Sequence, residues 1–361
     1  MSNSVHFPSD ICSAVTVPIV TSSARNRKHE TRVRAGGKRQ ANAGVATRRA
    51  VQFSAQNCYN PQDNIRETVR TIDIHTHGFG KYDTRTADPD DILSMARLHG
   101  SSGVDAIVPA VYSGPADTMR CSMAAIRAAM EHQRRDASLT NEEKTATILG
   151  IHLEGPFLNQ DMAGALDKNS FLDPTIDDYM RLADGFEDMV RVVTIAPELD
   201  GSPELIRFLS DRGISVSMGH SNATYSEAEA GYRAGARGVT HVFNAMRGVH
   251  HREPGIAGFA LMVEDVYVEV IADPYHLSDR LIEFIFRTKD PGRIVIVSDM
   301  VRMSQGKAGD EALRDDTGRL AGGSMTITQA AARLRALGID HVSIDRAIRE
   351  NPERYLAVSR E

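Results

Sequence analysis

The sequence predicts an α/β fold, a (β/α)8 TIM barrel, and two observations support this class. Short β-branched runs alternate with helix-like stretches from about residue 69 onward, and eight such units match the size of a barrel. Polar side chains of the kinds that bind metals follow several of these runs, at the carboxyl ends of the predicted strands. In a closed barrel these ends lie together on one rim. A doubly wound sheet fits the alternation nearly as well, so the polar residues decide for the barrel.

The predicted elements follow one another in a regular order. Each strand is a short β-branched run, and each helix is an amphipathic stretch between two such runs. The predicted strands are 69–75, 104–111, 146–152, 190–196, 214–218, 238–242, 266–271 and 293–298. The predicted helices include 115–135, 203–212, 224–235 and 278–288, with 325–337 and 343–350 closing the ring.

Residues 1–60 differ in composition from the barrel segment at 69–357. They contain nine Lys or Arg against two acidic residues, many polar side chains and no periodic apolar face. Such a composition predicts a disordered extension. A start site placed too far upstream and a transit peptide are the alternatives.

The bulk composition excludes several classes of protein. With 42 basic and 48 acidic residues the chain has no nucleic-acid footprint, and no apolar run approaches the roughly 20 residues of a membrane helix. Cys12, Cys58 and Cys121 are odd in number and share no metal-type spacing, which predicts neither a disulfide framework nor a zinc knuckle. We therefore expect a cytoplasmic protein.

Side chains that suit a metal ion lie at the carboxyl ends of five predicted strands. Imidazole and carboxylate groups bind zinc and similar divalent ions, and a catalytic site keeps one coordination position for water. His75 and His77 are two apart on an extended segment, so both rings point to one side. The six candidates are His75, His77, Glu154, His220, His241 and Asp299.

Each of these residues also has a structural interpretation. A single His-x-His or a strand-end histidine is commonly a satisfied polar residue, and Glu154 before Gly-Pro could cap a turn. Six such residues at five strand ends favour a shared metal site. A metal-free barrel with structural histidines is the alternative.

Five motifs carry a resemblance to a known family. They are HLEGPFLN (152–159), GHSNATYSEAEAGYRAGARGVTHVFNAM (219–246), HREPGIAGFAL (251–261), IADPYHL (271–277) and VSDM (297–300). Through them the chain resembles the N-acetylglucosamine-6-phosphate deacetylases of the amidohydrolase superfamily, from about residue 69 to 357. The resemblance implies a barrel of the metal-dependent hydrolase type.

The resemblance also implies a role for each metal-type residue. Glu154, His220 and His241 would bind the principal ion, the first-strand His-x-His pair would complete a second site as it does in some family members, and Asp299 would also contact metal. Asp299 would also be the catalytic base and acid. One or two divalent ions per chain are expected, with zinc first and iron or cobalt as alternatives.

A second set of residues matches substrate contacts of the family. Arg252 has the fork that phosphate oxygens accept in pairs, and His276 can add a donor. An ion pair with Glu253 or another carboxylate is the structural alternative for Arg252. The matched positions are Ala165, Asn244, Ala245, Arg252 and His276.

Three departures from the family bear on the expected substrate and fold. Leu166 takes the place of a His or Gln that faces the amide oxygen, and Pro274 replaces a common glycine in the loop before His276. We also expect a barrel that lacks most or all of the accessory β-sandwich found in relatives. The resemblance further implies a homodimer.

The expected function is hydrolysis of the N-acetyl amide of N-acetylglucosamine 6-phosphate, a phosphorylated amino sugar, to glucosamine 6-phosphate and acetate. Metal-activated water would be the nucleophile. The alternatives are another amidohydrolase that deacylates a different N-acyl amino sugar or amino acid, and a non-catalytic barrel that binds a sugar phosphate.

Overall fold

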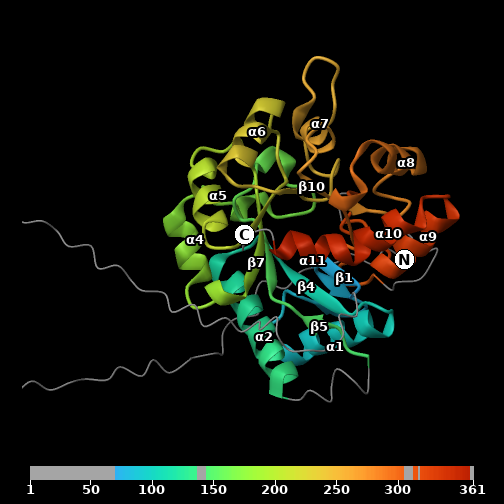
Figure 1. Ribbon diagram of the computed structural model, residues 1–361. Helices are drawn as coiled ribbons and strands as arrows, with labels where there is room; N and C mark the ends of the chain where they lie inside the picture. The colour runs from blue at the N-terminus through green and yellow to red at the C-terminus, as the bar shows by residue number, and fades with distance from the viewer. Residues whose placement is uncertain (1–69, 136–143, 305–311, 316–317, 358–361) are drawn as a thin grey trace, which may run out of the picture. The chain divides into compact units, whose positions relative to one another are not determined.

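A computed structural model describes residues 70–135, 144–304, 312–315 and 318–357 (Figure 1). Its main sheet is parallel, in the order β1-β4-β6-β7-β8-β9-β10-β11, with β5 pairing to β4. Backbone bonds from Asp299 N to His75 O (2.8 Å) and from His77 N to Met300 O (2.7 Å) join the last strand end to the first. The predicted TIM barrel is therefore confirmed.

The strands agree closely with the predicted runs. They are β1 (Ile72–Thr76), β4 (Ala106–Tyr112), β5 (Thr147–Ile148), β6 (Ile151–Glu154), β7 (Val190–Ile195), β8 (Ser215–Met218), β9 (Gly238–Val239), β10 (Tyr267–Ile271) and β11 (Ile294–Val297). A separate antiparallel ribbon joins β2 (Gly78–Phe79) to β3 (Tyr82–Asp83). Among the described residues it is the only sheet outside the barrel, so no β-sandwich is present there.

Two strands differ from their predicted bounds for backbone reasons. The run at 146–152 is divided into β5 and β6 by Gly150, whose φ is +148° and where a Cβ would lie 2.4 Å from the Met189 carbonyl oxygen. The run at 238–242 is a strand only over its first two residues, because His241 turns into the left-handed region with φ 29°.

The helices pack around the barrel as Figure 1 shows. Side-chain caps fix several starts: Thr224 and Glu227 form a capping box on α6, and Thr326 and Gln329 form one on α9. The helices are α1 (Pro89–Ser101), α2 (Ala116–Arg135), α4 (Ile176–Ala183), α5 (Ser202–Ser210), α6 (Tyr225–Ala234), α7 (Gly255–Met262), α8 (Asp279–Thr288), α9 (Ile327–Ala336), α10 (His341–Ile348) and α11 (Glu350–Ala357).

Two hydrophobic clusters form the core. The larger one lies between the strands and the surrounding helices. The smaller one includes Ile72, Val108, Val295 and Tyr355, so α11 contributes a fully buried tyrosine to the same cluster as strand residues. Because β1, β8 and β11 all contact α11, this helix is part of the barrel core.

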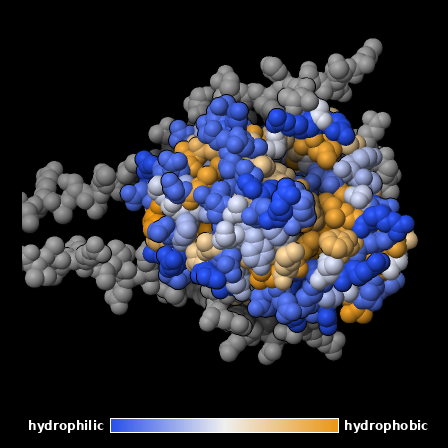
Figure 2. All heavy atoms as spheres, turned by 90° about the horizontal axis from the view of Figure 1, so that it is seen from above, coloured by the Kyte–Doolittle hydropathy of each residue, from blue (hydrophilic) through white to orange (hydrophobic). Residues whose placement is uncertain are grey.

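Several expectations concern membrane spans, the surface and the cysteines. No helix among the described residues is long and apolar enough to span a bilayer. On the face in Figure 2, hydrophilic side chains are interleaved with separate hydrophobic areas. Residues 1–60, with Cys12 and Cys58, lie outside the described residues. Cys121 on α2 is disulfide-bonded, which the cysteine spacing did not predict.

His99 should make the stability of the barrel depend on pH. It is fully buried on α1, where its Nε2 lies 3.1 Å from Thr76 Oγ1 and its Nδ1 has no partner among the described residues. Burial lowers the pKa of His99 from 6.5 to about 3. The folded state therefore keeps the ring neutral at pH 5, while the unfolded chain takes up a proton.

Stability from His99 is complete above pH 6.5 and is lost as the pH falls toward 3. Between pH 7 and pH 5 this residue should lower the free energy of unfolding by about 2 kcal/mol. Denaturant titrations measure the free energy of unfolding at both pH values. In His99→Gln the loss of this free energy between pH 7 and pH 5 should be smaller than in the wild type by that amount. Replacing the exposed His132 of α2 by Gln should leave the difference unchanged, and equal effects of the two variants would contradict the prediction.

Candidate metal centre

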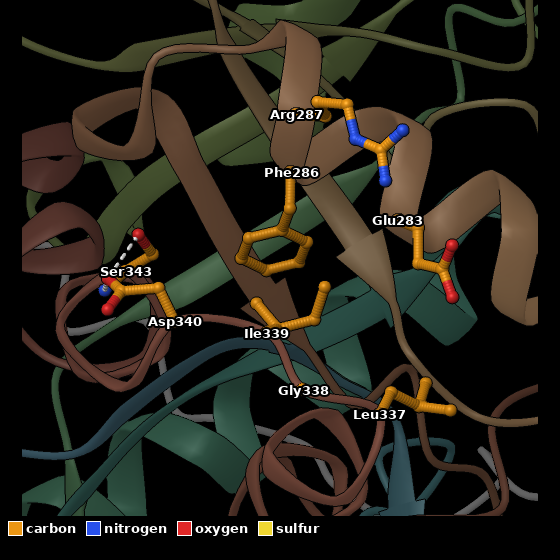
Figure 3. A pocket seen from close by; sticks show the side chains of 8 residues that line it. All are labelled: Glu283, Phe286, Arg287, Leu337, Gly338, Ile339, Asp340 and Ser343. Atoms are coloured by element: carbon orange, nitrogen blue, oxygen red, sulfur yellow. Dashed lines mark hydrogen bonds between the residues drawn. The ribbon is translucent and has the colours of Figure 1, made fainter.

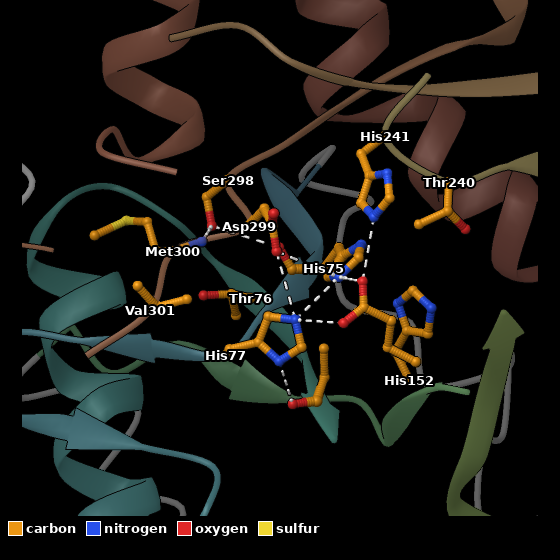
Figure 4. Close-up of polar contacts among 12 residues, drawn as sticks. His75, Thr76, His77, His152, Thr240, His241, Ser298, Asp299, Met300 and Val301 are labelled. Carbon is orange, nitrogen blue, oxygen red and sulfur yellow. Dashed lines mark hydrogen bonds and ion pairs between the residues drawn. The ribbon is translucent and has the colours of Figure 1, made fainter. Parts of the chain in front are cut away.

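Six side chains from five strand ends converge at one rim of the barrel, as the sequence predicted. Figure 4 shows His75, His77, His241 and Asp299 pointing into the same space. Glu154, at the end of β6, lies at the centre of the group, as its distances to four histidines show. Its Oε1 is 3.2 Å from His220 Nε2 and 3.2 Å from His241 Nε2, and its Oε2 is 3.1 Å from His77 Nε2. Asp299 Oδ1 is 3.4 Å from His77 Nε2 and 3.5 Å from His75 Nε2.

The geometry divides these residues into two potential metal sites that share a carboxylate. Glu154, His220 and His241 form one group of converging ligand atoms, and His75, His77 and Asp299 form the other. Glu154 also reaches the second group, because its Oε1 is 3.3 Å from His75 Nε2. The arrangement could hold two cations bridged by Glu154.

The outer ring nitrogens orient the imidazoles for metal binding. His77 Nδ1 lies 3.0 Å from Ala110 O, and His220 Nδ1 lies 2.9 Å from Met162 O. A carbonyl only accepts, so these Nδ1 atoms carry the hydrogen and leave the Nε2 lone pairs facing inward. This is the tautomer that a metal ligand needs.

The inner ring nitrogens approach each other closely. His75 Nε2 and His77 Nε2 are 3.2 Å apart, and His220 Nε2 and His241 Nε2 are also 3.2 Å apart. With the Nδ1 hydrogens bonded outward, the facing lone pairs of the first pair repel unless a proton or a cation lies between them. The donor set therefore fits a divalent metal.

The charges of the cluster also favour a cation. Burial alone would lower the pKa of His75, but the Glu154 and Asp299 carboxylates raise it well above its ordinary value. Burial would raise the pKa of Glu154, yet His77 and His75 hold it well below its ordinary value. The buried carboxylate stays ionised and attracts positive charge to this point.

Three of the predicted residues have an uncommon backbone conformation. The φ angles of His220, His241 and Asp299 are 46°, 29° and 49°, in the left-handed region that non-glycine residues rarely adopt. Each such residue costs about 1–3 kcal/mol and persists where the surrounding structure over-determines it. The strain coincides with the strand ends that turn these side chains toward Glu154.

A polar layer that the sequence analysis missed lies beside the ligands. His152 Nε2 is 2.8 Å from Thr194 Oγ1, which is 2.9 Å from Thr240 Oγ1, and the Thr240 hydroxyl donates to Ser217 Oγ at 2.7 Å. The His152 ring meets the His75 ring edge-on at 4.4 Å between centroids. His152, Thr194 and Ser217 each lie between apolar neighbours along their strands, a pattern that alone does not identify a buried site residue.

The predicted substrate residues around the histidine cluster have mixed exposure. Asn244 and Ala245 follow His241 and are half-buried, and Ala165 is exposed. Gly164 joins these segments, because a Cβ on it would lie 3.4 Å from Ala245 Cβ and 3.6 Å from His220 Cε1. Ala165 and Ala245 therefore belong to segments that meet beside His220.

The two predicted phosphate residues have different surroundings. Arg252 is exposed, and its Nη1 lies 2.9 Å from His251 Nε2. Glu253 instead accepts backbone N–H bonds from Tyr225 and Gly255, so the expected alternative pair is not formed. His276 is nearly buried, with Nδ1 3.0 Å from each Asp273 oxygen.

A hollow of about 410 Å³ lies apart from this centre, on the outside of the barrel between α8 and the segment that joins α9 to α10 (Figure 3). Its lining mixes apolar and charged side chains and contains no histidine. The lining residues are Glu283, Phe286, Arg287, Leu337, Gly338, Ile339, Asp340 and Ser343. The first three belong to α8, the next four form the connection between α9 and α10, and the last is in α10.

The chain is similar to curated and structurally solved proteins over most of its barrel. It is 30% identical to the N-acetylglucosamine-6-phosphate deacetylase of Vibrio furnissii, covering 73% of this chain and 66% of that protein. It is 29% identical to the N-acetylgalactosamine-6-phosphate deacetylase of Escherichia coli O157:H7, covering 80% and 77%. The chain thus spans about two thirds to three quarters of these relatives.

Solved structures agree with the sequence comparison. The N-acetylglucosamine-6-phosphate deacetylase of Thermotoga maritima superposes with a TM-score of 0.70 at 27% identity, over 80% of this chain and 79% of that one. A variant of the Mycobacterium smegmatis enzyme in complex with N-acetyl-D-glucosamine-6-phosphate superposes with a TM-score of 0.69 at 29% identity, over 80% and 77%.

The model of the amidohydrolase family matches residues 71–343. This range includes all six candidate metal ligands, and it confirms the resemblance predicted from the motifs. Amidohydrolases depend on metal ions, in agreement with the two ligand groups at the strand ends. The chain belongs to the amidohydrolase family.

Proposed function

We propose that this protein hydrolyses the N-acetyl amide of N-acetylglucosamine 6-phosphate, releasing glucosamine 6-phosphate and acetate. The convergence of four imidazoles and two carboxylates at one rim carries the proposal. Relatives at 29–30% identity bear the name of this deacetylase, and one solved neighbour holds the phosphosugar. A purely structural barrel has no use for facing Nε2 atoms 3.2 Å apart.

The proposed residues for the metal are those at the strand ends. Glu154, His220 and His241 would hold the principal cation, and His75 and His77 would hold a second one together with Asp299. A divalent cation there supplies a Lewis acid for the amide carbonyl and makes water more acidic. We propose zinc, because imidazole and carboxylate ligands suit it, with iron and cobalt as alternatives.

Asp299 is the proposed general base and acid. Its side chain is 14% exposed, whereas those of His75 and Glu154 are 0% and 4% exposed, so among these three it is the group that solvent reaches most easily. Asp299 would take a proton from water as the water oxygen bonds to the carbonyl carbon. As the C–N bond breaks, the same proton passes to the departing nitrogen, giving the free amine and acetic acid, which releases its proton to the solvent and leaves as acetate.

Leu166 and Pro274 shape the proposed substrate site. Leu166 is half-buried and has no side-chain donor for the amide oxygen, a group whose loss typically costs about 10²- to 10³-fold in rate. Pro274 follows Asp273 in the chain. The Asp273 Oδ1 atom accepts hydrogen bonds from the backbone N–H groups of the next two residues, Tyr275 and His276. The proline therefore leaves the bonds that hold His276 intact.

Arg252 should discriminate between phosphorylated and unphosphorylated sugars. Its exposed guanidinium forms no ion pair with a carboxylate among the described residues, which leaves the fork available to a phosphate. Arg252→Met should lower kcat/KM for the phosphosugar by about 10- to 100-fold, mainly by raising KM. This is the usual contribution of one hydrogen bond between charged groups. Activity on N-acetylglucosamine should not change.

Arg233→Met is the matched control, since Arg233 is an exposed arginine that pairs with Glu229 on α6. Steady-state kinetics on both sugars should show no effect of this variant. An equal loss on both sugars in Arg252→Met would assign Arg252 a structural role.

An assay of acetate release tests the function as a whole. Zinc-, iron- and cobalt-loaded protein should deacetylate N-acetylglucosamine 6-phosphate much faster than the unphosphorylated sugar and than N-acyl amino acids. N-acetylgalactosamine 6-phosphate belongs in the same panel because of the Escherichia coli relative. No turnover of any substrate by metal-loaded protein would favour the non-catalytic barrel.

A homodimer and a cytoplasmic location complete the proposal, and light scattering and cell fractionation test them. Both derive from the family resemblance and the composition.

A further inference from the structure

A buried carboxylate outside the predicted ligand set bonds to one of the proposed ligands. Glu269 Oε2 lies 3.1 Å from His75 Nδ1, and the two side chains are 1% and 0% exposed. Glu269 is on β10, between Val268 and Val270, which belong to the larger hydrophobic cluster between the strands and the helices. Because successive side chains of a strand point to opposite faces, the Glu269 side chain faces the barrel interior. A charged residue there needs a compensating partner.

His75 differs in this respect from the other proposed imidazole ligands. The Nδ1 atoms of His77 and His220 face neutral backbone carbonyls, and that of His241 has no partner among the described residues. Only the His75 ring donates to an anion within this set. An anionic acceptor fixes the tautomer as a carbonyl does, and it also makes the opposite nitrogen a stronger electron donor.

The charge on Glu269 changes the balance at the centre. Its Oε1 has no hydrogen-bond partner among the described residues, so the bond from its Oε2 to the His75 ring is the contact that compensates this buried carboxylate. Glu154, Asp299 and Glu269 together carry three negative charges. With one divalent cation the three carboxylates keep a net negative charge, and with two cations the net charge becomes positive. The third carboxylate therefore favours binding of a cation at both sites.

We propose that Glu269 is a positioning residue that orients His75 and sets the affinity of the second cation site, formed by His75, His77 and Asp299. The proposal rests on the metal centre assigned above. It concerns the occupation of that centre and not the identity of the substrate. The first site, of Glu154, His220 and His241, does not contact Glu269 through any bond described here.

Metal titration of Glu269→Gln tests the proposal. The amide keeps the size of the side chain and removes its charge. Zinc content measured by mass spectrometry across a series of buffered free-zinc concentrations should give two binding steps in the wild type. In the variant the second dissociation constant should rise by about 10- to 100-fold, with the first unchanged, the typical effect of losing such an outer partner.

Asp73→Asn is the matched control. Asp73 is a fully buried carboxylate on β1, and its Oδ1 accepts bonds from the backbone N–H groups of His75 (3.3 Å) and Ser298 (3.2 Å). Because it does not touch the His75 ring, its replacement should leave both binding steps in place. Retention of the first zinc step in each variant shows that the barrel has folded.

The titration separates this proposal from the proposed function. An unchanged second step in Glu269→Gln, or an equal weakening in Asp73→Asn, would overturn the role of Glu269 while leaving the deacetylase assignment open to its own assay. Failure of the wild type to release acetate, with the Glu269-dependent second step present, would overturn the function and leave the positioning role in place.

Discussion

Asp299→Asn should lower kcat for acetate release by about 10²- to 10⁴-fold, the usual contribution of a positioned general base and acid. Asparagine keeps the shape and one oxygen of the side chain, but it cannot accept and return a proton near neutral pH. KM should change little, because Asp299 is assigned to proton transfer and not to the sugar or phosphate. Steady-state kinetics on the phosphosugar measures both constants.

Metal content distinguishes loss of the base from loss of a ligand. Asp299 Oδ1 lies 3.4 Å from His77 Nε2, so the substitution could also weaken the second cation site. We expect the cation at Glu154, His220 and His241 to be retained, because Asp299 is outside that group. Full activity of the metal-loaded variant would remove Asp299 from the mechanism.

The strand ends were predictable from sequence because their chemistry is visible there. A histidine or carboxylate directly after a β-branched run breaks the apolar pattern, and barrel closure brings such residues together whatever their separation along the chain. His75 and Asp299 are over two hundred positions apart, yet the backbone bond from Asp299 N to His75 O closes the ring between them.

Glu269 and His152 were not predictable as site residues, because they lie within strands β10 and β6 and not after them. Glu269 interrupts VYVEVI, and His152 is the last residue of the third predicted run and lies between Ile151 and Leu153. One polar residue between apolar neighbours reads as an exposed position on an alternating strand. Their burial depends on which face closes onto the barrel axis. The early end of β9 likewise depends on the φ of His241, which no local pattern encodes.

Glu154→Gln should have the widest effect on the metal centre, because this carboxylate serves both ligand groups. Its Oε1 faces His220 and His241, and its Oε2 faces His77. Glutamine replaces one oxygen by an NH₂ that cannot bind a cation and removes the buried charge. We expect the metal content to fall well below that of a protein that has lost only one of its two cation sites. Acetate release should fall by about 10³-fold or more, because no cation remains to make water more acidic.

Glu198→Gln is the matched control for that substitution, since Glu198 is another carboxylate and bonds to Ser221 and Asn222, the two residues after His220. It accepts bonds from Asn159 Nδ2 (2.8 Å), Ser221 Oγ (2.6 Å) and Asn222 N (2.6 Å), all of them loop contacts. Its loss should reduce thermal stability and leave the metal-to-protein ratio unchanged. If elemental analysis finds wild-type metal in Glu154→Gln, the shared-carboxylate centre is wrong, because that centre depends on the Glu154 oxygens that lie within 3.3 Å of nitrogens from both groups of ligands.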